Sequence, residues 1–310
     1  MGFGCWGMGG GWGVRDDQQA KAALKRALEL GVNFFDTAYV YGEGHSERLL
    51  GEVIRDWKKP VFLATKVPAK TMEWPAQPTT PLARAFPAQW MIQCTETSLK
   101  RLGVERIDLQ QMHVWTDAWV ESEEWRLAAD RLKRQGKIRA FGVSVNDHEP
   151  ESVLKLVATG EIDSVQVIYN IFEQTPAERL FPLCQERGVG VIVRVPFDEG
   201  SLTGHLTPES RFEKGDWRAG YFRDDRLAKA CARVERLKAL LRPGVPTLSA
   251  LALKFVLSHP AVSTVIPGMR RVTHVEANAS VSDGRLVSSK EIQELKAHAW
   301  QRNFYVGAWD

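Results

Sequence analysis

Short apolar runs alternate with longer amphipathic stretches along most of this chain. The runs are rich in β-branched residues, and eight of them are predicted to be strands: Gly2–Trp6, Val32–Asp36, Val61–Thr65, Ile107–Met112, Ile138–Val143, Ser164–Ile168, Val189–Val193 and Ser263–Ile266. The stretches between them have apolar residues at helical spacing, which predicts helices over Gln18–Leu30, Ser46–Trp57, Ala88–Leu102, Ser122–Gln135, Pro150–Ala158, Pro176–Arg187, Arg226–Leu241 and Thr247–Leu257. Because the strands are apolar almost throughout, we expect a parallel sheet covered by helices.

Repetition of this strand–helix unit favours a closed (β/α)8 barrel, the TIM barrel, over an open doubly wound sheet. The chain has 310 residues, of which 44% are hydrophobic, and this is enough to bury one such core. We therefore expect an α/β protein with a single domain over residues 1–310. In such barrels the chemistry takes place on the loops at the carboxyl ends of the strands.

Two connections on that face are longer than the roughly two to six residues usual in α/β folds. Residues 68–87 follow the third strand, and residues 194–224 follow the seventh. Trp74 and Trp217 favour ordered lids here over disordered insertions. The tail beyond Ser280 is expected to fold back over the same face with its aromatic residues Trp300, Phe304, Tyr305 and Trp309.

Composition and charge exclude several classes of function. Lysine and arginine number 41 against 38 aspartates and glutamates, and so small an excess predicts neither a nucleic-acid nor a membrane partner. No apolar run approaches the roughly 20 residues of a membrane span, and the first residues lack the pattern of a signal peptide, so we expect a soluble, cytoplasmic protein. The cysteines show neither disulfide nor metal-binding spacing, which predicts reduced thiols and no metal: Cys5, Cys94, Cys184 and Cys231.

A glycine pattern at the start of the chain is misleading. Gly2-x-Gly4-x-x-Gly7 matches the dinucleotide fingerprint, but that fingerprint requires a preceding strand and a following helix. We interpret Gly2–Trp6 as the first barrel strand, followed by a glycine-rich loop, Gly7–Gly13, where a ligand could approach the backbone closely. A flexible glycine end is the alternative.

Asp36, Lys66 and His113 each end an apolar run, and Tyr41 follows Asp36 by five residues. These four side chains suit the reduction of a carbonyl group. A tyrosine, with an ordinary pKa of about 10, is a better acid-base catalyst when a cation such as Lys66 stabilises its phenolate, and Asp36 can keep that cation charged. His113 can donate a hydrogen bond to the carbonyl oxygen. Each residue alone is weak evidence, because a lone histidine is usually structural and an aspartate often caps a helix.

The segment Asn33–Glu47, together with Lys66 and His113, resembles the catalytic signature of the aldo-keto reductase superfamily, in its long-chain bacterial form. The resemblance implies a catalytic tetrad of Asp36, Tyr41, Lys66 and His113, with Tyr41 as the proton donor and NADPH as the hydride donor. It thereby implies reversible reduction of a small-molecule aldehyde or ketone to an alcohol.

The same resemblance extends to the nicotinamide end of the cofactor site. It implies that Ser144, Asn146 and Gln166 bind the carboxamide, although Gln166 could instead be an interior residue bonded only to protein. Arg194 stands where the family usually has an aromatic residue that stacks on the nicotinamide, and a planar guanidinium can also lie on a flat ring. The segment Pro196–Gly204 resembles the one that wraps the pyrophosphate. Further candidates in these segments and at the end of the first strand are Gly4, Cys5, Trp6, Val195, Pro196, Phe197, Ser201 and Gly204.

The segment Val265–Arg271 resembles the family's adenosine-phosphate site. The resemblance implies that Arg270 contacts the 2′-phosphate and Asn278 the adenine, with Gly268 and His274 also in the site. An arginine at a helix start suits a phosphate, so NADPH is the expected cofactor and NADH the second candidate. A solvated helix start is the alternative interpretation of Arg270.

Eleven tryptophans are many for a chain of this length. Six of them lie near predicted strand ends or in loops on the catalytic face: Trp6, Trp12, Trp74, Trp115, Trp119 and Trp217. They predict a pocket for carbonyl compounds with an apolar or ring portion, and the candidates for its lining are Trp12, Trp74, Trp115 and Trp217. An aromatic lid that packs only on itself is the alternative.

Two other functions stay open at this point. A Schiff-base aldolase would use Lys66, because imine chemistry also places a lysine at the end of a barrel strand. The second function is that of a cofactor-binding regulatory subunit related to channel β-subunits, although the complete set of four catalytic candidates argues against a loss of catalysis.

We expect a monomer or a small homo-oligomer. Family members commonly have a hairpin before the first strand that plugs the barrel floor, so either this subgroup lacks the plug or the start of the chain is truncated.

Overall fold

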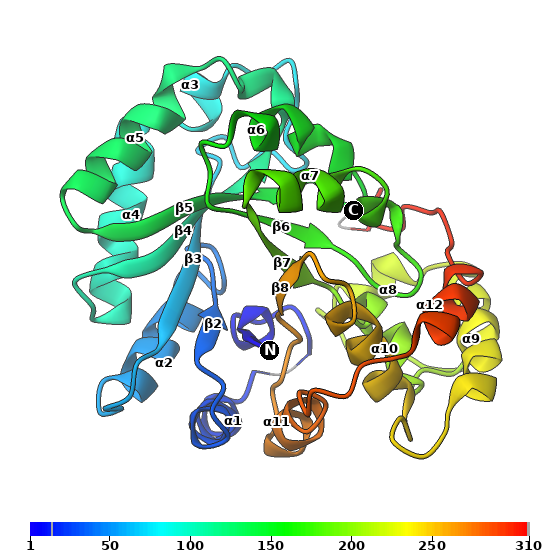
Figure 1. Ribbon diagram of the computed structural model, residues 1–310. Helices are drawn as coiled ribbons and strands as arrows, with labels where there is room; N and C mark the ends of the chain where they lie inside the picture. Colours follow the sequence, from blue (N-terminus) through cyan, green and yellow to red (C-terminus); the bar gives the residue numbers. More distant parts are fainter. Residues whose placement is uncertain (14, 309–310) are drawn as a thin grey trace.

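The computed structural model describes residues 1–13 and 15–308. Parallel strands follow one another in sequence order around a barrel, and helices lie outside them (Figure 1). The strands are β1 (Phe3–Gly4), β2 (Phe34–Asp36), β3 (Phe62–Pro68), β4 (Ile107–Trp115), β5 (Ile138–Val145), β6 (Ser164–Ile168), β7 (Gly190–Arg194) and β8 (Val262–Val265). The α-helices are α1 (Asp17–Glu29), α2 (His45–Ile54), α3 (Leu82–Ala85), α4 (Ala88–Leu102), α5 (Glu123–Arg134), α6 (Leu154–Thr159), α7 (Leu180–Arg187), α8 (Arg218–Tyr221), α9 (Arg226–Leu237), α10 (Leu248–Leu257), α11 (Val272–Ala279) and α12 (Ser289–Lys296).

Backbone contacts between the first strand and the residues after β8 close the barrel. Gly4 N donates to Pro267 O at 3.0 Å. Gly4 must be a glycine because a Cβ atom there would lie 2.6 Å from Ile266 O. The predicted (β/α)8 barrel is therefore confirmed. The glycine pattern at the start of the chain leads into the first barrel strand, as expected, and not into a dinucleotide fingerprint. The strand is shorter than predicted, Phe3–Gly4 instead of Gly2–Trp6, and Gly7 lies in a short 3-10 helix, Trp6–Met8, which was not expected.

Alternation along the strands sorts side chains between the barrel interior and the helix layer. At one level of the barrel the interior side chains are apolar and pack together: Phe34, Ala64, Leu109, Ala140, Ile192 and Ile266. Two residues further along β2, β3 and β4, the same face presents Asp36, Lys66 and Gln111. The polar part of the interior therefore begins where this apolar plug ends, toward the carboxyl ends of the strands.

Strands β3 and β4 run past their predicted ends. Their pairing continues from Ala64 opposite Leu109 to Pro68 opposite His113, beyond the apolar runs that predicted them. Lys66 and His113 consequently lie inside these strands, close to the carboxyl ends, instead of at the last residue.

Several predicted helices differ from those in the structure. The predicted helices Pro150–Ala158 and Pro176–Arg187 each open with a short 3-10 helix that contains the proline, and the α-helices α6 and α7 follow. The helix start expected at Arg270 is present as α11, which begins at Val272 with Arg271 as its N-cap. Sequence reasoning missed α12, although it begins with a capping box between Ser288 and Glu291 that can be recognised from sequence.

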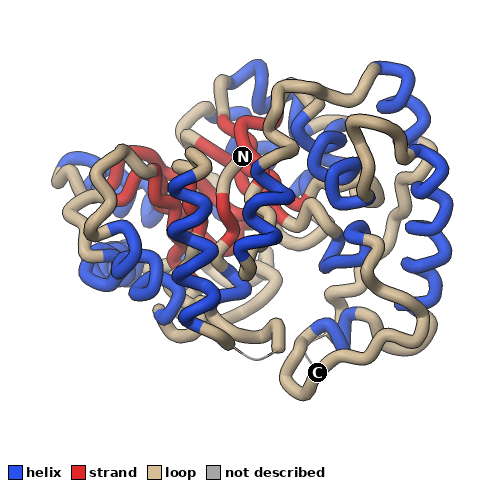
Figure 2. Tube along the Cα trace, turned by 90° about the horizontal axis from the view of Figure 1, so that it is seen from below, coloured by secondary structure: helices blue, strands red, loops and turns tan. Residues whose placement is uncertain are grey.

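A second group of packed aromatic residues lies apart from the main core. This aromatic cluster joins the loop after β1, the long segment after β7 and the carboxyl-terminal tail: Trp6, Trp12, Phe212, Trp217, Tyr221, Phe222, Trp300, Phe304 and Tyr305. Figure 2 shows the helices around the strands, with the end of the chain among loops to one side. The tail thus packs on the segment after β7; Trp309, predicted as part of it, lies outside the described residues.

Within the described residues, no helix is both long and apolar enough to cross a membrane. The same residues contain no group of three or more His, Cys, Asp and Glu side chains arranged to hold a metal ion.

Candidate active site

Asp36, Lys66 and Tyr41 form a hydrogen-bonded chain at the carboxyl end of the barrel. Lys66 Nζ donates to Asp36 Oδ1 at 2.5 Å, to Thr37 O at 2.7 Å and to Tyr41 Oη at 3.3 Å. These contacts engage all three hydrogens of the ammonium group. The Lys66 side chain is 0% exposed and that of Asp36 is 3% exposed, so each charge depends on the other to offset its loss of water.

The pKa values in this chain follow from burial and from these contacts. Burial opposes the charged form of Lys66, but Asp36 and Tyr41 outweigh burial, and the pKa of Lys66 is raised. Burial also raises the pKa of Tyr41, and the nearby Lys66 offsets only part of that shift. Tyr41 is therefore a protonated hydroxyl beside a permanent cation, which suits a proton donor.

His113 faces the same space from β4. Its ring centroid lies 6.3 Å from that of Tyr41 and 4.8 Å from that of Trp74. Burial lowers the pKa of His113 well below its ordinary value, and the cations Lys66 and Arg194 lower it further. The imidazole is therefore neutral near pH 7 and can donate one hydrogen bond without bringing a charge into the site.

Two amide side chains hold the second oxygen of Asp36. Gln166 Nε2 donates to Asp36 Oδ2 at 2.8 Å, and Gln111 Nε2 donates to the same oxygen at 3.2 Å. Sequence reasoning found Gln166 but missed Gln111. The available signal was its position two residues before His113, which places it on the interior face of β4.

Arg194 borders the site from β7. Its Nη2 donates to Val145 O at 2.9 Å and to Asp147 Oδ1 at 2.8 Å. Its Nε and the hydroxyl of Ser144 are buried and have no hydrogen-bond partner among the described residues. Unpaired buried polar atoms are costly, so these two atoms fit the polar groups of a bound ligand such as a nicotinamide carboxamide.

Asn146 connects the end of β5 to the loop after β3. Its Oδ1 accepts a hydrogen bond from Ala76 N at 2.9 Å, and its Nδ2 donates to Ala76 O at 3.2 Å and to Glu149 Oε2 at 2.8 Å. Both amide hydrogens are used, so Asn146 holds the loop after β3 in place. Its contact with the carboxamide stays a prediction.

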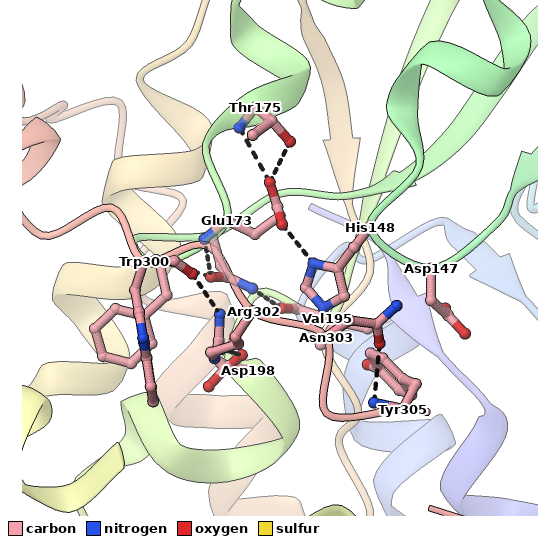
Figure 3. A network of polar contacts seen from close by, with 12 residues as sticks. Asp147, His148, Glu173, Thr175, Val195, Asp198, Trp300, Arg302, Asn303 and Tyr305 are labelled. Atoms are coloured by element: carbon pink, nitrogen blue, oxygen red, sulfur yellow. Dashed lines mark hydrogen bonds and ion pairs between the residues drawn. The ribbon is translucent and has the colours of Figure 1, made fainter. Parts of the chain in front are cut away.

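The tail holds the segment after β7 through two buried acids. Arg302 pairs with Asp198 (Figure 3). Asp198 also accepts a hydrogen bond from Ser201 Oγ at 2.7 Å. The hydroxyl of Tyr305 donates to Glu199. Burial raises the pKa of Glu199 to about 8. The tail therefore neutralises one of these acids with a charge and satisfies the other with a hydroxyl group.

The backbone of this segment also needs outside support. Val195, Asp198 and Glu199 have φ angles of 55°, 47° and 54°, in the left-handed region that non-glycine residues avoid. Such residues cost about 1–3 kcal/mol each and persist only where surrounding contacts fix them. The predicted contacts Pro196, Phe197, Ser201 and Gly204 lie in the same strained segment.

The predicted adenosine end lies between the first loop and α11. Arg270 Nη1 donates to Trp12 O at 2.5 Å, so Arg270 lies across the glycine-rich loop. At Gly268 a Cβ atom would meet nothing within 4 Å, which leaves the backbone open there. In the barrel wall nearby, Cys5 N donates to Asp36 O at 2.8 Å. The other residues predicted to contact the cofactor lie in the same elements. Gly4 and Trp6 flank Cys5, and His274 and Asn278 are in α11.

The tryptophans predicted to line a pocket lie in different surroundings. Trp74 is 40% exposed beside His113, and its Nε1 donates to Asp147 Oδ2 at 2.9 Å. Trp12 and Trp217 pack within the aromatic cluster. This is the arrangement of the alternative interpretation, in which the aromatic lid packs on itself.

Trp115 does not line the site, and its predicted place is corrected. Its side chain is fully buried, with ring centroids 5.9 Å from Trp119 and 5.9 Å from Trp125 of α5. The pairing of β4 with β5 shifts register between His113 and Trp115. Trp115 therefore belongs to the packing between the barrel and its helices.

The chain resembles known proteins over almost its whole length. The family model described as "Aldo/keto reductase family" matches residues 1–299. Aldo-keto reductase YhdN of Bacillus subtilis is 30% identical over 297 residues, which cover 94% of this chain and 87% of that protein. The solved glycerol dehydrogenase AKR11B4 from Gluconobacter oxydans is 28% identical with a TM-score of 0.78, covering 96% of this chain and 90% of the other. An aldo/keto reductase from Klebsiella pneumoniae in complex with NADP and acetate is 25% identical with a TM-score of 0.67, covering 97% and 92%.

Proposed function

Because the chain belongs to the aldo/keto reductase family, we propose that it reduces an aldehyde or ketone to an alcohol with NADPH, and that Tyr41 donates the proton. Family membership makes the protein an NAD(P)H-dependent oxidoreductase. The observation that carries the residue assignment is the position of Lys66 Nζ, in contact with both Asp36 and Tyr41.

NADPH, when bound, supplies a hydride to the carbonyl carbon. The candidate residues for its nicotinamide end are Ser144, Gln166 and Arg194, of which Ser144 and Arg194 have buried polar atoms in need of partners. The segment Pro196–Gly204 is the candidate for the pyrophosphate, and Arg270 for the 2′-phosphate.

The proton path follows from the chain of contacts. Tyr41 Oη gives its proton to the carbonyl oxygen as the alcohol forms, which leaves a phenolate beside Lys66 Nζ. Lys66 stabilises that phenolate, and Asp36 keeps Lys66 charged. His113, as a neutral imidazole, donates to the carbonyl oxygen and aligns it with Tyr41.

The charge and the hydrogen bonds of the Lys66 amino group argue against a Schiff-base aldolase. Imine formation requires a neutral, accessible amine, whereas Lys66 is buried and donates three hydrogen bonds, and its pKa is raised. No observation in the site favours a regulatory subunit without catalysis.

The test is NADPH oxidation across a panel of aldehydes and ketones, with wild type beside Tyr41→Phe. General acid catalysis typically contributes about 10²–10⁴-fold, so we expect a loss of turnover in that range with NADPH affinity retained. Tyr39→Phe is the matched control, because Tyr39 lies in the same loop but packs against Trp90 and Arg101. Equal turnover in wild type and Tyr41→Phe would refute the proton-donor assignment, and a wild type inactive on every carbonyl would refute the reduction itself.

A further inference from the structure

We propose that Gln111 is a positioning residue that fixes the orientation of the Gln166 amide, so that Gln166 presents its carbonyl oxygen to the nicotinamide carboxamide. This inference rests on the proposed function, because it concerns the same cofactor site. It assigns a role to a residue that lies beneath the site and touches neither cofactor nor substrate.

Gln111, Gln166 and Asp36 form a closed ring of hydrogen bonds inside the barrel. Both amides donate to Asp36 Oδ2, Gln166 at 2.8 Å and Gln111 at 3.2 Å. Gln166 Nε2 also donates to Gln111 Oε1 at 3.2 Å. The exposed fractions of the three residues are 0% for Gln111 and 2% each for Gln166 and Asp36, so water does not compete for these bonds.

The two hydrogen bonds that Gln166 Nε2 donates fix the orientation of its side-chain amide. Its Nε2 has two hydrogens, and the ring uses both, one on Asp36 and one on Gln111. Turning the amide over would place its carbonyl oxygen against the Asp36 carboxylate and against Gln111 Oε1, which repel it. Gln166 Oε1 is therefore the atom left for a ligand, and it can only accept a hydrogen bond. A carboxamide NH₂ group has the matching donor.

Gln111 fixes this arrangement because it interacts with both partners. It accepts from Gln166 and donates to Asp36, so both sides of its own amide are engaged. Without Gln111, one hydrogen of Gln166 would lose its acceptor and the side chain would be free to turn about its bond to Asp36.

Gln110, the next residue along β4, provides a matched control. It is equally buried, at 1% exposed, but alternation turns it to the other face of the strand. Its amide oxygen and nitrogen have no hydrogen-bond partner among the described residues. Replacement of Gln110 by methionine removes no hydrogen bond, whereas replacement of Gln111 by methionine breaks the ring at similar volume.

The experiment measures the affinity of Gln111→Met and Gln110→Met for two ligands, through the quenching of tryptophan fluorescence. NADPH carries the nicotinamide, whereas adenosine 2′,5′-bisphosphate binds only at the adenosine end. We expect Gln111→Met to raise the Kd of NADPH by roughly threefold to tenfold, the usual worth of one hydrogen bond, and to leave that of the bisphosphate unchanged. Gln110→Met should change neither.

Further variants separate positioning from general damage to the fold. Because Gln111 acts through Gln166, Gln111→Met should have no further effect on NADPH affinity in a Gln166→Met background. If Gln111→Met does not fold, Gln111→Asn keeps the amide but shortens its reach, and the same split between the two ligands is expected.

Three results would overturn the inference: unchanged NADPH affinity in Gln111→Met, equal weakening of both ligands, or additive effects in the double variant. A wild type that does not bind NADPH would instead refute the proposed function, and the two failures are therefore distinguishable.

Discussion

Single residues in this site owe their chemical state to one or two close neighbours. Asp36 and Lys66 keep their charges through each other, and His113 loses its charge through burial and two nearby cations. The sequence predicted the four catalytic candidates because each follows or ends an apolar run. The spacing of Gln111 from His113 indicates its face of the strand, but its contact with Asp36 depends on how β2 and β4 lie across the barrel interior, which no local pattern encodes.

Arg270 provides a prediction about cofactor preference. A guanidinium that binds the 2′-phosphate contributes to NADPH binding but not to NADH binding, because NADH lacks that group. Arg270→Ala is therefore expected to weaken NADPH by roughly tenfold or more and NADH much less, as measured by titration of both cofactors. Arg271→Ala, at the exposed neighbouring position, is the control. Equal losses for both cofactors would contradict the phosphate contact.

Secondary-structure elements were predicted well where periodicity is strong and poorly where distant contacts decide. All eight strands were found, and Ala88–Leu102 matches α4 in full. The arrangement of the long connections was less accessible to sequence reasoning. Asn146 holds the loop after β3 through Ala76, which is 70 residues away in the chain. Arg302 holds the segment after β7 through Asp198, which is 104 residues away.

The Arg302–Asp198 pair gives a prediction at this scale. The two side chains are 4% and 3% exposed, so Arg302→Gln leaves a buried carboxylate without its cation. Breaking a buried pair costs about 3–5 kcal/mol, and the hydroxyls of Ser201 and Tyr221 that remain on Asp198 favour the lower end of that range.

The loss of unfolding free energy in Arg302→Gln is measured by denaturant unfolding, with Arg179→Gln as the control. Arg179 pairs with Glu151 at the surface, with 65% and 64% exposed side chains, so its loss should cost only about 0–1 kcal/mol. Similar unfolding free energies for the two variants would show that the tail does not stabilise the segment after β7.

For the whole molecule, the distribution of thiols predicts its reactivity. Cys5, Cys94 and Cys184 are buried, and burial raises the pKa of the last two to about 12. Cys231 is partly exposed, so a thiol reagent at neutral pH should modify it first and the other three only after unfolding. Counting modified thiols by mass spectrometry, with Cys231→Ser as the control, checks this. Rapid modification of the variant's remaining cysteines in the native state would contradict it.

The closure of the barrel has a consequence for how the chain is made. Gly2 N bonds to Val265 O, and Gly4 pairs with Gly268, so the first strand finds its second neighbour only in the last part of the chain. During synthesis on the ribosome, β1 therefore has one open edge until residue 268 has emerged. Contacts so far apart in sequence form slowly, and an open strand edge is a place where unfinished chains can pair with each other. A chaperone that shields the early strands should thus raise the yield of folded protein more than a stronger promoter would.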